Sequence, residues 1–475
     1  MRYLKDQLQD YRDSGSYPFH MPGHKRRGMH FSDPAGVDIT EIDGFDNLHG
    51  ADGVLKDAQD RAAALYGSDR CFYLVNGSTC GLLAAVCAAV KKRGKLLLAR
   101  NCHRAVYHAV FLSELTAVYV SPVITGNDLQ GQITPEQVSR VLKSEPDIAA
   151  VIVTSPTYEG IVSDVAGIAA AVHEHGIPLI VDEAHGAHFG FGGGFPENAV
   201  RLGADAVVMS LHKTLPSFTQ TALLHLNGER IDAERVEMYL SVFETSSPSY
   251  LFLAGMDECV RLIRERGEEL FSRYRGMLDD FYESAARLRN LHVMTRADLR
   301  EEEAFDRDDG KIIIFSGEAG ISGGELYQRL RAQYGLQMEM ASGNYVLGMT
   351  SIMDEPEGFR RLVQALSEID SGVAGGDGKS GAVTGFTARM YQENPRKMDI
   401  FQALEAPCAN VPFSEACGRI SAGFIFLYPP GIPVLVPGEE IGSAFVERIC
   451  ECHRQGLRVE GTVDFISGRI KIVYF

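Results

Sequence analysis

The sequence is poor in positive charge. Its 475 residues include 46 Lys and Arg against 63 Asp and Glu, which gives a formal net charge of −17 at pH 7. A nucleic-acid-binding protein normally carries a basic face, so this balance argues against that class and we expect no nucleic-acid partner. The acidity is compatible with a cationic substrate, but many acidic proteins are simply soluble cytoplasmic proteins.

The sequence also lacks the features of secreted, membrane and metal-binding proteins. The first residues, MRYLKDQLQDYRDSG, contain no apolar segment, so we expect no secretory signal. The most apolar stretch, 420–437, contains four prolines and cannot form a membrane-spanning helix. Nine scattered cysteines form no disulfide framework, and Cys450-x-Cys452-His453 has no second ligand pair. We therefore expect a cytoplasmic protein with no metal and no membrane partner.

Length and composition predict several packed domains. A chain of 475 residues with 45% apolar residues is too long for one core, and no internal repeat is visible. The Gly-rich segment 371–385 predicts a flexible linker. We expect an N-terminal arm at 1–40, a large domain at 41–235, a small α+β domain at 236–370 and a C-terminal α+β module at 386–475.

Short apolar strands alternate with helical stretches in the large domain. Strands are predicted at 71–75, 95–99, 117–120, 149–154, 179–182 and 206–210, and helices at 78–92, 103–114, 135–143 and 165–175. Strands that are apolar throughout indicate an α/β fold whose mainly parallel sheet is covered on both faces. Ligands of such folds bind beyond the carboxyl ends of the strands.

The small domain is predicted from a different pattern. Apolar residues from 270 to 288 form one continuous helical stripe. Strands at 311–315 and 345–349 and helices at 323–334 and 357–369 follow. This pattern indicates a smaller α+β domain packed on the long helix.

An acid and a lysine follow two strands of the predicted sheet. Asp182 ends the strand 179–182, and Lys213 follows the strand 206–210. Pyridoxal phosphate (PLP) needs this combination, because a lysine forms the Schiff base and a carboxylate keeps the pyridine nitrogen protonated. Alone, the pair is better explained as a strand-end cap and a surface lysine.

A third motif favours the cofactor. Asn76-Gly77-Ser78-Thr79 joins a strand to a helix and offers backbone N–H groups and hydroxyls to an anion. Ser210 and His212 lie beside Lys213 and can donate to the same phosphate. A Gly-Ser-Thr turn alone is often simple helix capping. The order turn, Asp, Lys is specific, and it predicts a PLP site.

These motifs make the sequence similar to the fold-type-I PLP enzymes, whose large domain is aspartate-aminotransferase-like, and within them to the prokaryotic ornithine/lysine/arginine decarboxylases. The matching stretches are His20-Met-Pro-Gly-His-Lys25, Asn76-Gly-Ser-Thr79, Asn101-Cys-His103, Ser155-Pro-Thr-Tyr-Glu-Gly160, Asp182-Glu-Ala-His185, Ser210-Leu-His-Lys213, Thr245-Ser-Ser-Pro248 and Tyr428-Pro-Pro-Gly-Ile-Pro433. They run through nearly the whole chain.

The resemblance implies a role for each residue around the cofactor ring. Lys213 would hold PLP, Asp182 would pair with the pyridine nitrogen, and His103 would stack on the ring. Ala184 would pack beneath the ring, and His185 would lie near its edge with its role left open. Each histidine, taken alone, is more often a packed or capping residue, and only the motif context favours a place at the cofactor.

The resemblance also implies how the phosphate is bound. The phosphate ligands would be Gly77, Ser78, Thr79, Ser210 and His212. Thr245 and Ser246 would reach the phosphate of a neighbouring subunit, which implies a homodimer with shared active sites and leaves a higher oligomer open.

The implied reaction is PLP-dependent decarboxylation of a basic L-amino acid to agmatine or a diamine, as in polyamine biosynthesis. Glu415 is either the acid that binds the distal cation or a surface glutamate. Only nineteen residues precede His20, so we expect a short form without the N-terminal wing domain of larger members. This architecture favours arginine as substrate, with lysine or ornithine next.

Some alternatives remain open on the sequence. The same fold hosts aminotransferases and Cα–Cβ lyases, and a non-catalytic binding protein is a less favoured possibility because both Asp182 and Lys213 are present. His20-Met-Pro-Gly-His-Lys25 is either an active-site segment or a turn. Tyr428 to Pro433 is best explained as scaffolding.

Overall fold

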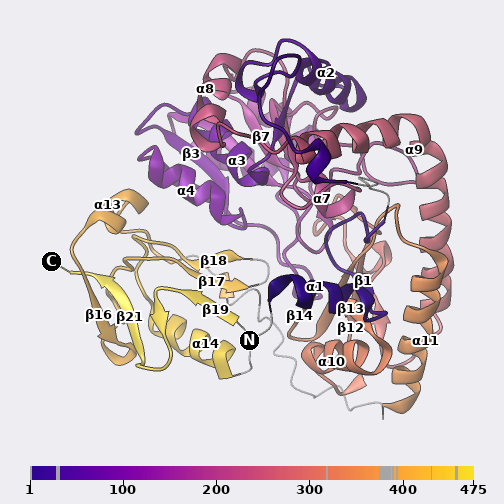
Figure 1. Cartoon of the computed structure of the whole chain (residues 1–475). Helices are drawn as coiled ribbons and strands as arrows, with labels where there is room; N and C mark the ends of the chain where they lie inside the picture. The colour runs from indigo at the N-terminus through magenta and orange to yellow at the C-terminus, as the bar shows by residue number, and fades with distance from the viewer. Residues whose placement is uncertain are drawn as a thin grey trace.

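The computed structural model describes residues 3–27, 33–316, 319–373, 387, 390–391, 394–428, 431–454 and 458–474. The predicted linker 371–385 therefore lies outside the described residues from position 374 onward. In Figure 1 the large domain occupies the top, the small domain the lower right and the C-terminal module the lower left. None of the helices within the described ranges is long and apolar enough to cross a membrane.

The large domain is built on a seven-stranded sheet with the order β2-β9-β8-β7-β5-β3-β4. Its strands are β2 (Arg70–Leu74), β3 (Lys95–Ala99), β4 (Thr116–Val120), β5 (Ile148–Thr154), β7 (Leu179–Asp182), β8 (Ala206–Met209) and β9 (Ala222–Leu226). The five strands from β8 to β4 are parallel, and they are apolar because both faces of the sheet are covered. The predicted α/β fold with a mainly parallel sheet is confirmed.

One edge of this sheet contains β9, a strand that the sequence pattern did not predict. Strand β9 pairs antiparallel with both β2 and β8, so one edge of the sheet is antiparallel. Apolar strands have the same composition whether they run parallel or antiparallel, and periodicity therefore could not give the direction of β9.

Helices that connect the strands cover the sheet. They are α2 (Val54–Tyr66), α3 (Gly77–Ala89), α4 (Arg104–Leu112), α5 (Pro135–Ser144), α6 (Val165–His173), α7 (Leu211–Thr214) and α8 (Ala233–Phe243). Local sequence starts several of them, since Thr134 and Gln137 form a capping box at α5 and Asp164 caps α6. The predicted boundary at 235/236 falls inside α8. This helix packs on α3, and Glu244 after it accepts from the backbone N of Val75 at 2.8 Å, so α8 lies with the large domain.

Helix α9 (Tyr250–Ala285) joins the two larger domains and forms the right-hand side of Figure 1. It begins well before the apolar stripe at 270–288. Its first half packs on α2 and its second half on α11 (Pro356–Gly372), so the apolar face changes partners along the helix. The apolar stripe at 270–288 therefore predicted only the second half of α9, which packs on the small domain.

The small domain is a four-stranded antiparallel sheet with two helices. The sheet order is β10-β12-β15-β14. Its elements are β10 (His292–Val293), β12 (Lys311–Phe315), α10 (Gly323–Tyr334), β13 (Leu336–Met338), β14 (Met340–Ser342), β15 (Tyr345–Met349) and α11. After helix α1 (Leu4–Asp13), the N-terminal arm contributes β1 (Tyr17–Phe19), which pairs parallel with β13. Strands β6 (Ile161–Val162) and β11 (Asp306–Arg307) pair between the domains.

The C-terminal module has two three-stranded sheets, β16-β21-β20 and β18-β17-β19. Its elements are α13 (Ile400–Glu405), β16 (Cys408–Pro412), a short 3-10 helix (Phe413–Glu415), β17 (Ile425–Tyr428), β18 (Ile432–Leu435), α14 (Ser443–Arg454), β19 (Arg458–Gly461), β20 (Val463–Asp464) and β21 (Arg469–Val473). Arg100 of the large domain, only 2% exposed, joins the module by donating to the carbonyl of Pro433 at 2.7 Å and approaching Glu439 at 3.4 Å.

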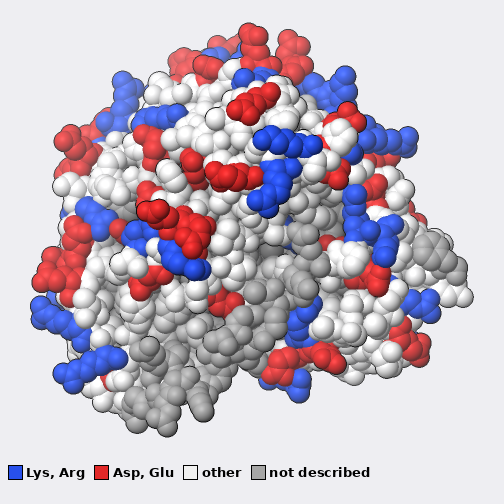
Figure 2. Space-filling model, turned by 180° about the vertical axis from the view of Figure 1, so that it is seen from behind, with Lys and Arg blue, Asp and Glu red and all other residues white. Residues whose placement is uncertain are grey.

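Acidic and basic side chains are interspersed on the face shown in Figure 2. Exposed charges also pair on α9, where Arg261 contacts both Glu258 and Glu265. The net negative charge of the chain is therefore not gathered into a single acidic patch on this face.

Candidate active site

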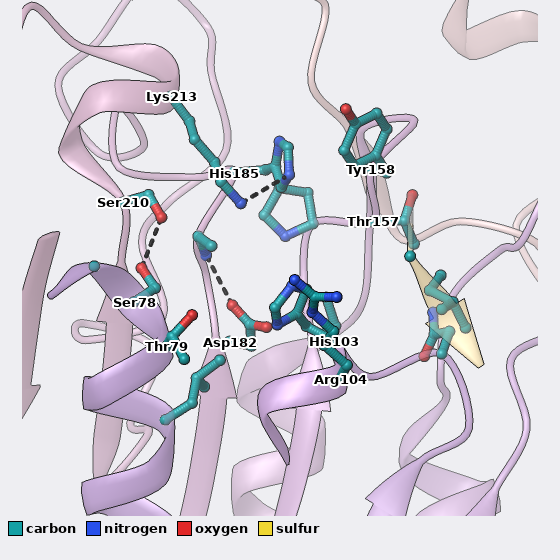
Figure 3. A pocket seen from close by; sticks show the side chains of 18 of the residues that line it. Ser78, Thr79, His103, Arg104, Thr157, Tyr158, Asp182, His185, Ser210 and Lys213 are labelled. Carbon is teal, nitrogen blue, oxygen red and sulfur yellow. Dashed lines mark hydrogen bonds between the residues drawn. The ribbon is translucent and has the colours of Figure 1, made fainter. Parts of the chain in front are cut away.

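A cavity of about 320 Å³ opens at the carboxyl ends of the parallel strands. Asp182 at the end of β7 and Lys213 in α7, just after β8, both line it (Figure 3). Because β7 and β8 are adjacent parallel strands, their carboxyl ends place these two residues in the same cavity. The structure thus brings together the acid and the lysine that are separated in the sequence.

Lys213 is surrounded by protein rather than by water. Burial lowers the pKa of its ammonium group, while the charge of Asp182 acts in the opposite direction. Its Nζ lies 3.2 Å from Nε2 of His185. A buried lysine with a lowered pKa is available as a free amine closer to neutral pH, as a lysine nucleophile requires.

Asp182 is only 3% exposed, and its Oδ1 accepts from the backbone N of Ala184 at 3.2 Å. Burial raises the pKa of the carboxyl group, and the positive charge of Lys213 opposes that shift. The cavity therefore holds a carboxyl group that needs a cationic or protonated partner. Ala184 also lines the cavity.

The other end of the cavity is suited to an anion. Helix α3 begins at Gly77, whose φ of +75° suits glycine. The first backbone N–H groups of the helix have no carbonyl acceptor within the helix and are available to a ligand. The Oγ atoms of Ser78 and Ser210 lie 2.6 Å apart, which joins α3 to the segment before Lys213. Thr79 lies on the first turn of the same helix and also lines the cavity.

Two histidines at the cavity are neutral at physiological pH. His103 caps α4 by accepting from the backbone N of Ala105 at 3.2 Å, and burial lowers its pKa to about 3. His212 contacts the carbonyl of Thr221 through Nδ1 at 2.9 Å, and burial lowers its pKa to about 4. Because a carbonyl oxygen can only accept, the contact places the single N–H of the neutral ring on Nδ1. Nε2 of His212 is then an acceptor. His212 must become protonated before it can donate to a phosphate.

The structure does not bring three predicted residues to this cavity. Thr245 and Ser246 are exposed after α8, outside the cavity lining. Glu415 is exposed at the end of the 3-10 helix Phe413–Glu415 and also lies outside the lining. On its own subunit Glu415 therefore lies away from this cavity, as the alternative of a surface glutamate describes. The glutamates that do line the cavity are Glu159 and Glu460.

Several lining residues carried no predicted role. They are Met21, Asn101, Arg104, Gln130, Thr157, Tyr158, Glu159, Phe426, Ile432 and Glu460. Asn101 and Tyr158 follow β3 and β5, so the rule that sites lie beyond strand ends could have found them. Glu460 and Phe426 come from β19 and β17 of the C-terminal module. No local pattern in the sequence predicts that these two residues line the cavity.

The segment His20–Lys25 supports the lysine-bearing helix. Met21 lines the cavity, and the backbone N of Gly23 donates to the carbonyl of His212 at 2.7 Å. Nζ of Lys25 is buried and donates to the carbonyls of Pro18, His20 and Met349 at 2.7 to 3.0 Å. This segment therefore contacts the cavity through one side chain and anchors α7 through its backbone.

The polar groups around the cavity fit PLP. Asn101 Oδ1 and Gln130 Oε1 are buried atoms of lining residues, and neither has a hydrogen-bond partner among the described residues. These two oxygens accept hydrogen bonds, whereas the lysine, the buried acid and the helix N-terminus offer an amine, a carboxyl group and N–H donors. The residues present therefore suit an aldehyde, a pyridine nitrogen and a phosphate.

Comparison with known proteins gives close relatives over nearly the whole chain. An arginine decarboxylase from Halalkalibacterium halodurans is 31% identical over 471 residues, which cover 96% of this chain and 94% of the relative. An arginine decarboxylase from Bacillus subtilis is 29% identical, with coverage of 96% and 94%.

Solved structures show the same fold. Lysine decarboxylase A from Pseudomonas aeruginosa superposes with a TM-score of 0.73 at 18% identity, covering 99% of this chain and 82% of that one. An alanine–glyoxylate aminotransferase from Nostoc sp. gives a TM-score of 0.54 at 14% identity, covering 66% and 86%. The second likeness extends the fold beyond decarboxylases.

Two family models cover most of the chain. The model "Orn/Lys/Arg decarboxylase, major domain" matches residues 3–299, and the model "Orn/Lys/Arg decarboxylase, C-terminal domain" matches residues 386–451. The resemblance seen in the sequence motifs is thereby confirmed. The chain belongs to the Orn/Lys/Arg decarboxylase family, and it is a PLP-dependent enzyme that removes the carboxyl group from a basic amino acid.

Proposed function

We propose that the enzyme decarboxylates L-arginine to agmatine, with lysine and ornithine as weaker substrates, at the cavity between β7, β8 and α3. The meeting of Lys213, Asp182 and the Ser78–Ser210 contact in one cavity carries this proposal. The preference for arginine is supported by two relatives that match nearly the whole chain and are arginine decarboxylases.

The cofactor supplies an electron sink for the pair of electrons left when CO2 departs. Asp182 would keep the pyridine nitrogen protonated, since its buried carboxylate lies in low dielectric and favours a cationic partner. Ser78, Ser210 and the first N–H groups of α3, which begins at Gly77, would bind the phosphate, with Thr79 beside them. The negative charge of the phosphate would raise the pKa of His212, and the protonated ring would then donate a hydrogen bond to the phosphate.

His103 and Ala184 would hold the ring in place. His103 lines the cavity beside Asp182 in Figure 3, and its ring is fixed because Nδ1 caps α4. Ala184 offers a flat, small surface. Lys213 would hold the cofactor and, once the substrate amine has displaced it, would as an ammonium group supply the proton that Cα takes up after CO2 has left.

Glu460 is our candidate for binding the distal cation of the substrate. It lines the cavity from β19, and its Oε1 already accepts from the guanidinium of Arg458 at 2.5 Å. A substrate guanidinium can compete for the same carboxylate geometry. Glu159 is a weaker candidate, because it is buried and accepts from the Tyr345 hydroxyl at 3.0 Å.

CO2 release from arginine, lysine and ornithine, measured in parallel with product identification, tests the substrate. We expect kcat/KM to be highest for arginine. The Lys213→Ala variant should lose the visible absorbance of the bound cofactor and all measurable CO2 release. Faster turnover of lysine or ornithine would overturn the substrate preference, and an active, coloured Lys213→Ala variant would overturn the role of Lys213.

A matched pair of glutamate variants tests the substrate carboxylate. Glu460→Gln should raise KM for arginine about 10- to 150-fold, the range for losing a hydrogen bond to a charged group. Glu415→Gln should leave KM unchanged, because Glu415 is exposed away from the cavity. The reverse result would return the role to Glu415.

We propose that the enzyme works as a homodimer with shared active sites, in which Thr245 and Ser246 reach the phosphate at the other subunit's cavity. Their exposure on one subunit is compatible with this role. Coexpressing Lys213→Ala with a Thr245→Val/Ser246→Ala double variant tests it. A mixed dimer would keep one intact site, so about a quarter of wild-type activity should return. Failure to recover activity would argue against shared sites.

We also propose the domain division 1–40, 41–235, 236–370 and 386–475, moved at its second boundary to follow Glu244. The separate apolar cluster of the C-terminal module supports this division. Limited proteolysis with mass spectrometry of the resistant fragments tests it. Resistant fragments that cross the proposed boundaries would argue against the division.

A cytoplasmic location is proposed because all nine cysteines are free, which suits a reducing compartment. Cell fractionation with an antibody against the protein tests it. Recovery of the protein outside the cytoplasmic fraction would contradict it.

A further inference from the structure

One arginine lines the cavity without an acidic partner. Arg104 is the first residue of α4, and its side chain is exposed where it lines the cavity. Its guanidinium group makes no ion pair and no hydrogen bond with any residue that the structure describes. The positive charge of Arg104 is therefore available to a ligand that enters the cavity.

Helix α4 gains no stability from a cation at this position. The backbone dipoles of a helix place partial positive charge at its N-terminus, so an acid is favoured there and a cation is mildly unfavourable. The helix already has a cap, since His103 accepts from the backbone N of Ala105 at 3.2 Å. The fold thus gives no reason for the charge of Arg104, and the cavity does.

Arg104 lies at the end of the cavity that faces away from the expected phosphate site. In Figure 3, Ser78 and Ser210 lie on one side of Asp182, and Arg104 and Tyr158 lie on the other. The Oγ atoms of Ser78 and Ser210, 2.6 Å apart, mark the phosphate end. The side of the cavity that holds Arg104 is therefore left for the substrate.

The charges of the cavity lining match those of a basic amino acid. Apart from Lys213 and Asp182, which would bind the cofactor, the described lining residues with acidic or basic side chains are Arg104, Glu159, Glu460 and three histidines. The histidines are neutral, because burial lowers their pKa values. Once its α-amine has joined the cofactor, the substrate still brings a carboxylate and a distal cation. Glu460 would take the cation, which leaves Arg104 for the carboxylate.

We propose that Arg104 binds the α-carboxylate of the substrate and thereby distinguishes the amino acid from the amine product. In the reaction the bond between Cα and the carboxylate breaks, its electron pair stays with Cα, and Cα takes up one proton. The product agmatine carries two cations and no carboxylate, so Arg104 repels the end of the molecule that it attracted before. Because Arg104 is exposed, the attraction is weak and opposes the loss of CO2 little.

This inference rests on the proposed function, and two inhibitors that differ at one end test it. Agmatine and δ-guanidinovalerate share a guanidinobutyl chain, which ends in an ammonium group in agmatine and in a carboxylate in δ-guanidinovalerate. Their competitive inhibition constants are measured against arginine on the full-length enzyme loaded with cofactor. Arg104→Gln should raise the constant for δ-guanidinovalerate about two- to fivefold, the range for an exposed ion pair. It should lower the constant for agmatine, whose ammonium group no longer faces a guanidinium.

Three further variants complete the test. Arg104→Lys keeps the charge and should stay near the wild type with both inhibitors. Arg264 on α9 is also exposed and lies outside the cavity lining, so Arg264→Gln is the matched control and should change neither constant. Arg104→Glu places an acid where the helix favours one, and it decides the question if Arg104→Gln does not fold. It should shift the two constants in the same opposite directions.

Constants that stay unchanged in a folded Arg104→Gln or Arg104→Glu variant, or that rise together, overturn the inference. The ranking of arginine, lysine and ornithine by the wild type tests the proposed function separately. If lysine or ornithine ranks first, the diamine made from it and the matching ω-amino acid replace the two inhibitors. Opposite shifts of their constants are then expected for the same reason, and parallel or absent shifts overturn the inference in that case too.

Discussion

Lys311 shows how burial changes the chemistry of a single residue. Burial lowers its pKa to about 8, while Asp308 and Glu339 oppose that shift. Asp308 in turn lies 3.2 Å from Nε2 of His188, and its own pKa is lowered below the usual range by that partner and by Lys311 despite burial. Residues of both larger domains therefore form a group of opposite charges next to His185, which contacts Lys213.

This burial predicts a dependence of stability on pH. Unfolded Lys311 regains a pKa near 10.4, so between about pH 8 and 10.4 the unfolded chain binds more protons there than the folded chain does. The contribution of Lys311 to stability should rise through that window and be constant below it. The melting temperature of the wild type should therefore increase relative to Lys311→Met as pH rises from 8 to 10. A parallel pH profile for the two proteins would contradict the lowered pKa.

Among the elements, those with clear local periodicity were predictable. The strands at 95–99, 311–315 and 345–349 and the helix at 323–334 have the predicted bounds. Helix α9 was half missed, because its N-terminal half is covered by a different domain. Propensity and periodicity report the face that a segment buries, and they carry no information about the partner.

The residues of the site were predictable from the sequence to the same extent as the elements, since only local features could be used. Asp182, Lys213 and Ser78 lie just beyond strands, where topology alone predicts a ligand. Lys311 lies within a strand of the small domain and Glu460 lies in the C-terminal module. The contact of Lys311 with His185 and the place of Glu460 in the cavity lining depend on how the domains pack. Tertiary packing of this kind has no local signature in the sequence.

Helix α11 offers a prediction about packing between elements. A Cβ on Gly358 would overlap the ring of Tyr17, whose hydroxyl donates to Asp354 at 2.8 Å. Gly358→Ala should therefore destabilise the small domain by about 1–3 kcal/mol, the usual cost of overpacking. Gly276→Ala on the exposed face of α9 meets no atom within 4 Å and should stabilise by about 0.5–1 kcal/mol. Chemical denaturation of both variants measures the difference, and equal effects would contradict this packing.

For the whole molecule, the buried contact between Arg100 and the C-terminal module is the sharpest test of domain docking. Arg100→Met removes the donor to Pro433 and leaves Glu439 buried beside Asn394 and the backbone N of Val436. Loss of one partner of a buried ion pair costs about 3–5 kcal/mol.

In the Arg100→Met variant, proteases should cleave the C-terminal module from the protein at temperatures at which the wild type stays intact. Arg261→Met, which breaks only exposed pairs on α9, is the control and should digest like the wild type. Equal protection of Arg100→Met and the wild type would mean that other contacts dock the module.

The pairing of β1 with β13 has a consequence for the order of events during synthesis. Tyr17 must wait for Asp354, 337 positions later, before its hydroxyl finds its acceptor, and Phe19 must wait for Met338. At usual ribosome speeds that interval lasts about 20 to 70 s. Throughout it, the nascent chain carries an apolar strand with no edge to join. The first strand of the protein thus stays unpaired until the small domain has been made, although the C-terminal module is made later still.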